Sequence, residues 1–335
     1  MKPCSIILTG LFLFTTIFQQ IVSISIFLQN ELNKTVVITG ATGLLGKAIA
    51  VNLSRNGYKL TIISRDTEKS RRILPFADSF VEWNSSKGSD ELAKSLNGTN
   101  SVINLAGASV GDKRWSLKYK DIILSSRIKT TDAIVKVISG LTNPPALINA
   151  SAIGYYGDSG DTVLEENSKR GKGFLADVVD DWEKSADSAQ IFTRVVKVRI
   201  GIVLANEGGA LQKMILPYKF FAGGTLGSGK QWMSWIHIDD LAEIFRYIIE
   251  NDSIKGAVNL TAPNPVTMKD FSTILGKTLN RPSFFKVPEF LLNFILGESA
   301  QMVTFSQRVS SAFIQNNGYK FKFSKLNEAL KDILK

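Results

Sequence analysis

Thr35-Val36-Val37-Ile38-Thr39-Gly40-Ala41-Thr42-Gly43-Leu44-Leu45-Gly46 is the stretch that decides the fold of this chain. Its β-branched first half predicts a buried strand, and the residues from Lys47 to Asn56 have the pattern of a helix. Gly40 permits a tight turn, Gly43 leaves room for a ligand, and Gly46 lets the helix pack closely on the strand. Backbone N–H groups and the positive helix end then meet at one point, which favours the pyrophosphate of a dinucleotide. The alternative is a glycine-rich turn that binds nothing.

Composition sets the limits around this motif. The chain has 335 residues, of which 44% are hydrophobic and 21% charged, enough for one large or two smaller domains. The net charge is +10, but no run of five basic residues occurs, so we do not expect a nucleic acid as partner. Cys4 is the only cysteine and His237 the only histidine. The sequence therefore predicts no disulfide in the folded body and no metal site.

The first 30 residues carry a single charge, on Lys2. The segment from residue 5 to residue 28 is apolar or weakly polar, and its start resembles a signal peptide, with Ser23-Ile24-Ser25 as small residues for cleavage. If it is not cleaved, the segment is long enough to associate with a membrane as an anchor. We expect this leader to direct the chain into the secretory route or an organelle, of plastid or endomembrane type. An artefactual start upstream of a soluble protein is a third interpretation.

Strand and helix patterns alternate along the chain, which predicts an α/β fold with a doubly wound parallel sheet and helices on both faces, as in a Rossmann domain. Further strands are expected at 59–64, 79–83, 101–105, 146–150 and 195–202, and helices at 90–96, 116–139, 174–189 and 241–249. From residue 263, prolines separate short helical segments before an amphipathic helix at 326–334. We therefore expect a leader (1–30), a dinucleotide-binding domain (34–262) and a small, mostly helical module (263–335) over the substrate cleft.

The end of the second strand indicates which dinucleotide is bound. A carboxylate that binds the ribose of NAD is expected about 20 residues after the glycine loop, but Ser64-Arg65 stands there. Arginine holds a 2′-phosphate by paired hydrogen bonds, whereas a carboxylate would repel it. The sequence thus predicts NADP(H) rather than NAD(H), with Asp66 keeping NAD(H) open and with an ordinary surface role as the alternative for Arg65.

Further segments carry a family resemblance. They are Asn104-Leu105-Ala106-Gly107, Arg114-Trp115, Ser126-Arg127-Ile128, Ser151-Ala152-Ile153-Gly154-Tyr155-Tyr156-Gly157, Phe174-Leu175-Ala176, Trp182-Glu183, Arg199-Ile200-Gly201-Ile202-Val203-Leu204, Gly208-Gly209-Ala210-Leu211, Trp235-Ile236-His237-Ile238-Asp239-Asp240 and Asn259-Leu260-Thr261-Ala262-Pro263. With them, residues 34 to 335 resemble the extended short-chain dehydrogenase/reductase superfamily of the NAD-dependent epimerase/dehydratase type. The match narrows to its "epimerase family protein" branch, which includes YfcH-like bacterial proteins with a C-terminal domain of unknown function and a plant chloroplast-division protein.

This resemblance implies an NADP-type cofactor bound by a Rossmann domain. The matching contact positions are Gly40, Thr42, Gly43, Leu44, Leu45, Gly46, Ser64, Arg65, Leu105, Ala106, Gly107, Arg127 and Val203. Arg127 would reach a phosphate from its helix. Its alternative is an ordinary charge on a helix surface.

Typical members of the superfamily use Ser, Tyr and Lys, with the last two spaced Y-x-x-x-K. Ser151 stands at the serine position, but the tyrosine position falls at Phe174 and the lysine position near Asp177 or Val178. The usual proton relay is therefore expected to be absent, because the tyrosine hydroxyl and the lysine that lowers its pKa are both missing.

Two interpretations remain for the Ser151 loop. Either Tyr155 or Tyr156 acts as the acid beside Ser151, or these residues only shape the pocket of a protein that binds NADPH without turnover. Further along the chain, Asp239 and Asp240 are expected to cap the helix at 241–249, and His237 is expected to have an architectural role.

The sequence thus favours an NADP(H)-dependent oxidoreductase or epimerase-like enzyme acting on an unidentified small molecule. The alternative is a non-catalytic NADPH-binding protein with a regulatory or structural role, for example in plastid division.

Overall fold

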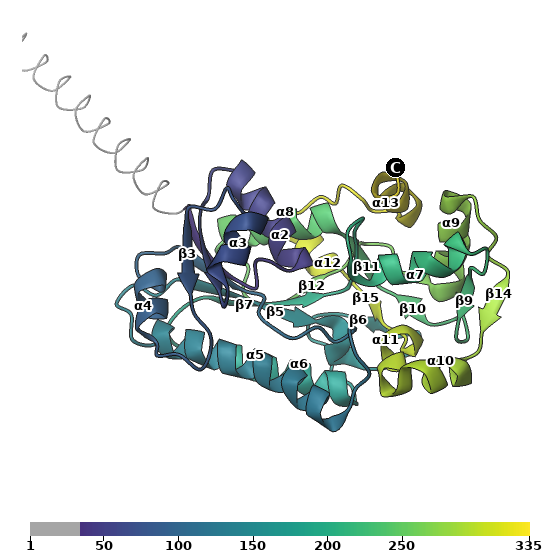
Figure 1. Cartoon of the computed structure of the whole chain (residues 1–335), viewed down its shortest axis with the longest axis horizontal. Helices are drawn as coiled ribbons and strands as arrows, with labels where there is room; N and C mark the ends of the chain where they lie inside the picture. Colours follow the sequence, from purple (N-terminus) through teal and green to yellow (C-terminus); the bar gives the residue numbers. More distant parts are fainter. Residues whose placement is uncertain (1–33) are drawn as a thin grey trace, which may run out of the picture.

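The computed structural model describes residues 34–335 (Figure 1). The predicted leader, residues 1–30, lies outside this part. Among the helices of the described part, none has both the length and the apolar character needed to cross a membrane.

A parallel sheet of seven strands organises the structure. The strand order is β12-β7-β5-β4-β1-β2-β3. The strands are β1 (Thr35–Thr39), β2 (Lys59–Ser64), β3 (Ser79–Glu82), β4 (Ser101–Asn104), β5 (Ala146–Ala152), β7 (Val195–Ile200) and β12 (Gly256–Leu260). The chain moves outward from β1 to β2 and β3, then returns to β4 on the other side of β1. The direction reverses between β1 and β4, and ligands of such sheets bind beyond the carboxyl ends of the strands at this point.

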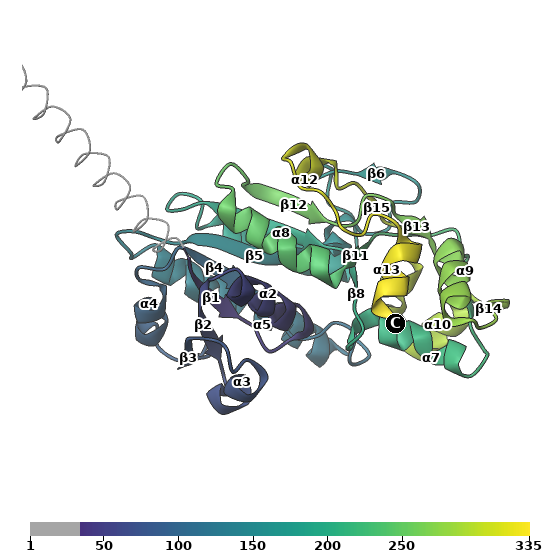
Figure 2. The ribbon, with the colours of Figure 1, turned by 90° about the horizontal axis from the view of Figure 1, so that it is seen from above.

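Helices cover both faces of the sheet (Figures 1 and 2). One face carries α2 (Leu44–Arg55), α3 (Thr67–Ile73) and α8 (Ile238–Glu250), and the other carries α4 (Asp90–Leu96), α5 (Leu117–Ile138) and α6 (Phe174–Asp187). Leu53 of α2 and Phe245 of α8 share one buried cluster with the strands, whereas Leu92 of α4 and Ile134 of α5 lie in another. These two apolar layers confirm the predicted Rossmann-type α/β fold.

The strand predicted at 195–202 ends early, at Ile200. The Ile202 N–H donates a hydrogen bond of 2.8 Å to the Ser234 carbonyl oxygen, and a Cβ atom on Gly201 would lie 2.6 Å from that oxygen, so only glycine fits where the chain turns. The chain leaves the sheet there and forms β8 (Ile202–Leu204), which pairs with β11 (Trp235–His237). This departure brings Val203 to the carboxyl edge of the main sheet.

Short strands and helices cover the carboxyl ends of the main strands. The paired strands are β9 (Gly224–Leu226) with β14 (Phe285–Val287), β10 (Trp232–Met233) with β13 (Val266–Thr267), and β6 (Val163–Leu164) with β15 (Arg308–Val309). The helices are α7 (Gly209–Lys219), α9 (Met268–Leu279), α10 (Glu289–Leu296), α11 (Gln301–Thr304), α12 (Ala312–Asn316) and α13 (Leu326–Ile333), with short turns η1 (Ile153–Tyr156) and η2 (Gly297–Ala300). Leu211, Phe271 and Leu330 share one buried cluster, so elements from both sides of residue 263 build this cover.

The start of α8 corrects one prediction. The helix begins at Ile238, and its N-cap is His237, whose Nδ1 accepts a hydrogen bond of 3.0 Å from the Asp239 N–H. Asp240 instead accepts hydrogen bonds from the backbone N–H groups of Lys322 and Phe323. The expectation that Asp239 and Asp240 cap this helix was wrong, because Asp240 fastens the C-terminal segment to α8.

Candidate functional site

The glycine loop between β1 and α2 has three glycines with different steric roles. Gly40 has a φ of +72°, and a Cβ atom there would lie 2.8 Å from the Leu105 carbonyl group. A Cβ on Gly46 would lie 2.4 Å from the Gly40 oxygen, whereas a Cβ on Gly43 would meet only that oxygen, at 3.4 Å. The fold therefore requires glycine at positions 40 and 46, but Gly43 is dispensable for packing and leaves its outer side open.

The amino end of α2 has no capping side chain. Gly43 is the N-cap residue, no side chain accepts a hydrogen bond there, and the first turn contains no acidic residue. The first N–H groups and the positive end of the helix dipole are thus available to an anion. The loop and helix end fit the phosphates of a dinucleotide.

Arg65 and Asp66, the two residues at the end of β2 that would distinguish NADP(H) from NAD(H), have different surroundings. Asp66 is the N-cap of α3, and its carboxylate accepts a hydrogen bond of 2.9 Å from the Lys69 N–H. Ser64 donates its hydroxyl to the Asp66 carbonyl oxygen at 3.0 Å, while the Arg65 side chain is exposed. Because the Asp66 carboxylate already caps a helix, Arg65 is the better placed of the two to meet a ribose substituent.

A buried amide network at the carboxyl ends of β1, β4 and β5 was missed in the sequence. Asn104 accepts a hydrogen bond from Thr39 (2.7 Å) and donates to Thr131 (2.9 Å) and Asn149 (2.7 Å). It also accepts a hydrogen bond from the Ala106 N–H, at 3.3 Å. Through the Ala106 N–H the network holds the backbone among the predicted cofactor positions Leu105, Ala106 and Gly107. The signal for it was two asparagines in otherwise mostly apolar strands, Asn104 at the end of β4 and Asn149 within β5.

Arg127 lies beside this network and is half-buried. It donates hydrogen bonds to the carbonyl oxygens of Ala108 (3.1 Å) and Ile123 (2.8 Å), and it lies over the Trp182 ring. Burial lowers the pKa of Arg127 to about 10. A Cβ on Gly107 would come within 3.1 Å of this guanidinium, so the arginine packs against the end of β4. Its contact with a cofactor phosphate stays a prediction.

Ser151 belongs to a buried ion-pair network. Its hydroxyl donates to a Glu183 carboxylate oxygen at 2.5 Å, and Arg199 donates two hydrogen bonds of 2.8 Å to the same carboxylate. The pKa of Arg199 would be lowered by burial, but the hydrogen bonds and charge of Glu183 raise it overall. Ser151, Glu183 and Arg199 are each at most 4% exposed, so this group is closed to solvent.

Tyr156 joins the same network from η1. Its hydroxyl donates to Asn259 at 2.7 Å and accepts a hydrogen bond of 2.9 Å from Arg199. Burial raises the pKa of Tyr156 to about 12. Tyr155 differs: its ring lies under the Arg199 guanidinium, 3.6 Å from the ring centre, and its hydroxyl forms no hydrogen bond with the described residues. The structure thus brings Ser151 and Tyr156 together through Arg199 and Glu183, but their catalytic roles stay predictions.

The helix α6 presents apolar side chains where the superfamily pattern has tyrosine and lysine. Phe174 packs on Trp115, with the ring centres 5.1 Å apart, and Val178 is buried. Asp177 lies on the exposed side of α6. The described residues therefore place no tyrosine–lysine pair on this helix.

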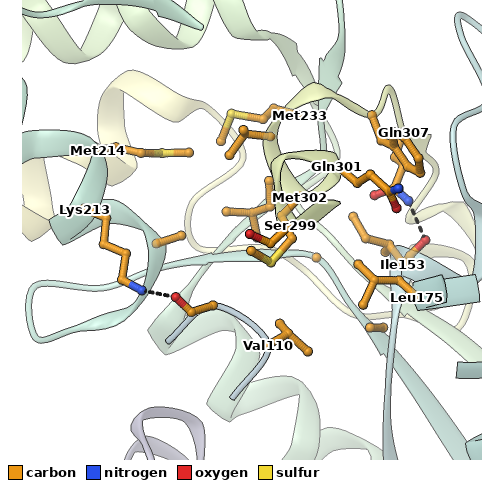
Figure 3. Close-up of a pocket in the computed structure, with 18 of the residues that line it drawn as sticks. Val110, Ile153, Leu175, Lys213, Met214, Met233, Ser299, Gln301, Met302 and Gln307 are labelled. Atoms are coloured by element: carbon orange, nitrogen blue, oxygen red, sulfur yellow. Dashed lines mark hydrogen bonds between the residues drawn. The ribbon is translucent and has the colours of Figure 1, made fainter. Parts of the chain in front are cut away.

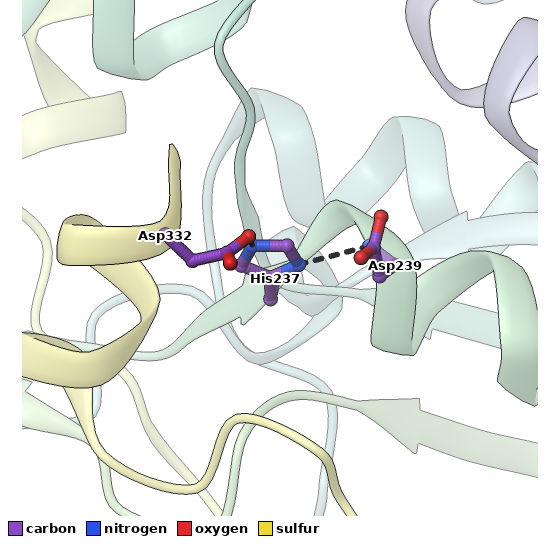
Figure 4. A group of neighbouring side chains, drawn as sticks. All are labelled: His237, Asp239 and Asp332. Carbon is purple, nitrogen blue, oxygen red and sulfur yellow. Dashed lines mark hydrogen bonds and ion pairs between the residues drawn. The ribbon is translucent and has the colours of Figure 1, made fainter. Parts of the chain in front are cut away.

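His237, Asp239 and Asp332 lie close together in Figure 4, with ligand atoms within 4.8 Å of one another. The Nδ1 atom of His237 already accepts the Asp239 N–H, so the neutral ring carries its proton on Nε2, 3.5 Å from the Asp332 carboxylate. The ring also stacks on Phe323, at 3.8 Å between ring centres. This arrangement suits a histidine that joins α8 to α13, because no nitrogen lone pair is directed to a cation.

A cavity of about 980 Å³ lies between the sheet edge and the C-terminal cover (Figure 3). Leu44, Leu45 and Val203 line it at the cofactor loop. Ile153 and Gly154 line it beside the Ser151 loop, whereas Ser151, Tyr155 and Tyr156 are not part of its wall. The volume is suitable for a small molecule together with one end of a cofactor.

Comparison with known proteins places this geometry in a family. The model of the NAD dependent epimerase/dehydratase family matches residues 36–173, and a domain of unknown function matches residues 287–333. The chain is 40% identical to the Arabidopsis thaliana protein named "Epimerase family protein SDR39U1 homolog, chloroplastic" over 309 residues, which cover 91% of this chain and 88% of the relative. It is 38% identical to "Epimerase family protein YfhF" of Bacillus subtilis over 302 residues, covering 89% of this chain and 97% of that protein.

A solved structure is similar as well. The human epimerase family protein SDR39U1 (isoform 2), crystallised with NADPH, is 32% identical, with a TM-score of 0.78 over 89% of this chain and 98% of that one. These similarities extend over the sheet, the glycine loop and the C-terminal cover. The chain therefore belongs to the epimerase family of proteins, within the NAD dependent epimerase/dehydratase group.

Proposed function

We propose that the protein is an NADP(H)-dependent oxidoreductase or epimerase-like enzyme that acts on a small molecule. The observation that carries this proposal is the uncapped amino end of α2 at Gly43, which adjoins the cavity of about 980 Å³. The human relative crystallised with NADPH supports the choice of cofactor.

Different residues of the chain would bind different parts of such a cofactor. The backbone N–H groups of Gly43–Gly46 would hold the diphosphate, Arg65 the 2′-phosphate, and Val203 would border the nicotinamide end. When bound, the reduced cofactor supplies a hydride.

A carbonyl group that accepts a hydride also needs a proton. The hydroxyl hydrogens of Ser151 and Tyr156 are directed to Glu183 and Asn259. Tyr155 is the remaining candidate for proton transfer, because its hydroxyl has no hydrogen-bond partner among the described residues. Its neighbour Gly154 lines the cavity, whereas Tyr155 stands outside the wall, so its side chain would have to turn toward the substrate.

Turnover tests this proposal. Purified protein is incubated with NADPH deuterated at C4 and a panel of aldehydes and ketones, and deuterium in the product is measured. We expect transfer to at least one substrate, strongly reduced in Tyr155→Phe while cofactor affinity is unchanged. Saturable NADPH binding without transfer to any member of a broad panel would contradict an enzymatic role.

A non-catalytic NADPH-binding regulator is the second candidate. The observation that favours it is the pair Phe174 and Val178 on α6, which replaces the usual proton relay. Variants introduced into a cell in which the gene is deleted distinguish the two functions. An enzyme loses activity in both Gly43→Asp and Tyr155→Phe, whereas a regulator loses it only in Gly43→Asp, which blocks the cofactor.

We also propose that residues 1–30 direct the chain to an organelle or endomembrane, with membrane association through residues 5–28. The apolar sequence supports this, and the Arabidopsis relative is named chloroplastic. A fluorescent fusion should enter the organelle with these residues and stay in the cytosol without them. Cytosolic fluorescence of the full chain would contradict the proposal.

A further inference from the structure

The cavity collects almost all methionines of the chain. The sequence contains 5 methionines, and every one after Met1 lines this cavity: Met214, Met233, Met268 and Met302. They come from α7, β10, α9 and α11, which are distant in sequence, and Figure 3 shows Met214, Met233 and Met302 around the same space. Methionine is flexible and polarizable, so such a wall adapts to apolar, especially aromatic, ligands of varied shape.

The buried part of the wall is mostly apolar, and its buried polar residues are Gln231, Ser234, Ser272 and Ser299. Its buried apolar residues include Val178, Trp182, Met233, Met268, Phe271 and Leu292. They lie on α6, β10, α9 and α10 and enclose the space from different sides.

The polar side chains of the wall are mostly engaged with the protein itself. Gln231 donates to the carbonyl oxygens of Leu226 (2.9 Å) and Val303 (3.0 Å). Gln307 donates to Ile153 and Gly157, at 2.9 and 3.0 Å. Gln301 is different, because its amide oxygen is buried without a hydrogen-bond partner in the described residues. Reorientation of this amide offers one polar contact to a ligand.

Charged groups lie at the rim of the cavity. Asp112 is the only carboxylate in the described wall, and its side chain is 65% exposed, close to Lys213, which is 64% exposed. Lys113, Arg114 and Lys172 line the cavity and are exposed as well. The half-buried guanidinium of Arg127 also lines the cavity and is held by backbone carbonyl oxygens at the cofactor end. Away from these cations, the interior offers no counter-charge to a charged group that would lose its hydration there.

We infer that the cavity binds a bulky, uncharged, apolar carbonyl compound, of aromatic or alicyclic type, rather than a nucleotide-linked sugar. This inference names the substrate class of the proposed enzyme and so rests on the proposed function for its catalytic meaning. Binding itself is measurable without turnover.

Methionine methyl groups provide the direct test. The full chain is labelled with ¹³C at the methionine methyl groups, and each signal is assigned with a Met→Leu variant. The probe is 2-acetonaphthone, an uncharged bicyclic ketone, and UDP-glucose is the charged comparison. We expect the ketone to shift the signals of Met214, Met233, Met268 and Met302 but not that of Met1, and UDP-glucose to leave all of them unchanged.

A charged side chain introduced into the cavity wall tests the same inference, and a charged side chain introduced outside the wall is its control. Met302→Lys should weaken ketone binding at least tenfold, and the milder Met302→Gln should weaken it less. Phe294→Lys is the control, because Phe294 is 79% exposed on α10 and outside the cavity wall, and it should change the affinity less than twofold. NADPH titration of the same variants confirms that they are folded.

Two results would overturn the inference. One is a shift of the cavity methionines by UDP-glucose that the ketone cannot compete away, and the other is ketone binding that persists in Met302→Lys or is lost in Phe294→Lys. A failure of the proposed function gives a different result. In that case the ketone still binds in the cavity, but NADPH does not bind or no hydride is transferred.

Discussion

Two loops at the carboxyl edge of the same sheet use their residues in opposite ways. The loop after β1 leaves backbone donors uncapped at Gly43, whereas the loop after β5 directs the hydroxyls of Ser151 and Tyr156 into a closed network around Arg199. The first loop therefore offers its hydrogen-bonding capacity to a ligand, and the second uses it to hold the structure. A polar group at the edge of a sheet is therefore not reactive by its position alone. It can act on a ligand only if its hydrogen-bonding capacity is not already used within the protein.

The largest effect is expected from breaking the closed network. Glu183→Gln leaves the Arg199 guanidinium buried without a counter-charge, and we expect it to lower the free energy of unfolding by about 3–5 kcal/mol. Denaturant unfolding measures this. The control is Glu207→Gln, which removes an exposed salt bridge with Lys47 and should cost less than about 1 kcal/mol. Equal losses in the two variants would contradict a structural role for the network.

The glycine loop gives the next effect. Gly46→Ala places a methyl group 2.4 Å from the Gly40 oxygen, and we expect a loss of about 3 kcal/mol in thermal or denaturant unfolding. Gly43→Ala, with its nearest contact at 3.4 Å, should stay within about 0.5 kcal/mol of the unmodified chain. If the two variants are equally stable, the assigned roles of these glycines are wrong.

Substitutions of the two tyrosines of η1 should differ in their effects on stability and on hydride transfer. Tyr156→Phe removes the partner of Arg199 and Asn259 and should cost about 1–2 kcal/mol of unfolding free energy. Tyr155→Phe should leave stability nearly unchanged and affect hydride transfer instead. Unfolding curves and turnover of both variants check this. A stability loss in Tyr155→Phe with none in Tyr156→Phe would reverse our assignment.

A smaller effect concerns pH. Burial lowers the pKa of His237 from its ordinary value of 6.5, partly opposed by the carboxylates of Asp239, Asp240 and Asp332. Below about pH 6.5 the unfolded chain binds a proton that the folded state resists, so stability should fall as the pH decreases and level off above that value. His237→Asn keeps a capping side chain but cannot titrate. An unchanged pH slope in this variant would exclude His237 as its source.

Much of the fold was predictable because its signals are local. The apolar strands and the glycine spacing of residues 35–46 defined the Rossmann-type sheet, and Gly40 and Gly46 have the predicted steric roles. The end of β7 at Ile200 was not predictable, since the next residues leave the main sheet and pair with β11, which lies more than 30 positions later in the chain.

The backbone of the candidate site, with its glycine loop, could be predicted from the sequence. The hydrogen-bond networks between its side chains could not. The pairing of Ser151 with Glu183 joins residues 32 positions apart, and that of Tyr156 with Asn259 joins residues 103 apart. The cavity methionines likewise meet only through tertiary packing. No periodicity or spacing in the sequence reports such contacts.

Calorimetric titration of NADPH into the unmodified chain and into Gly43→Asp tests the central claim most directly. Aspartate at an N-cap stabilises a helix, but its charge would repel the diphosphate at the amino end of α2. We predict saturable binding at one site in the unmodified chain and none in Gly43→Asp, although the variant unfolds at an equal or higher temperature. No binding to the unmodified chain, or equal affinity in both proteins, would contradict the account.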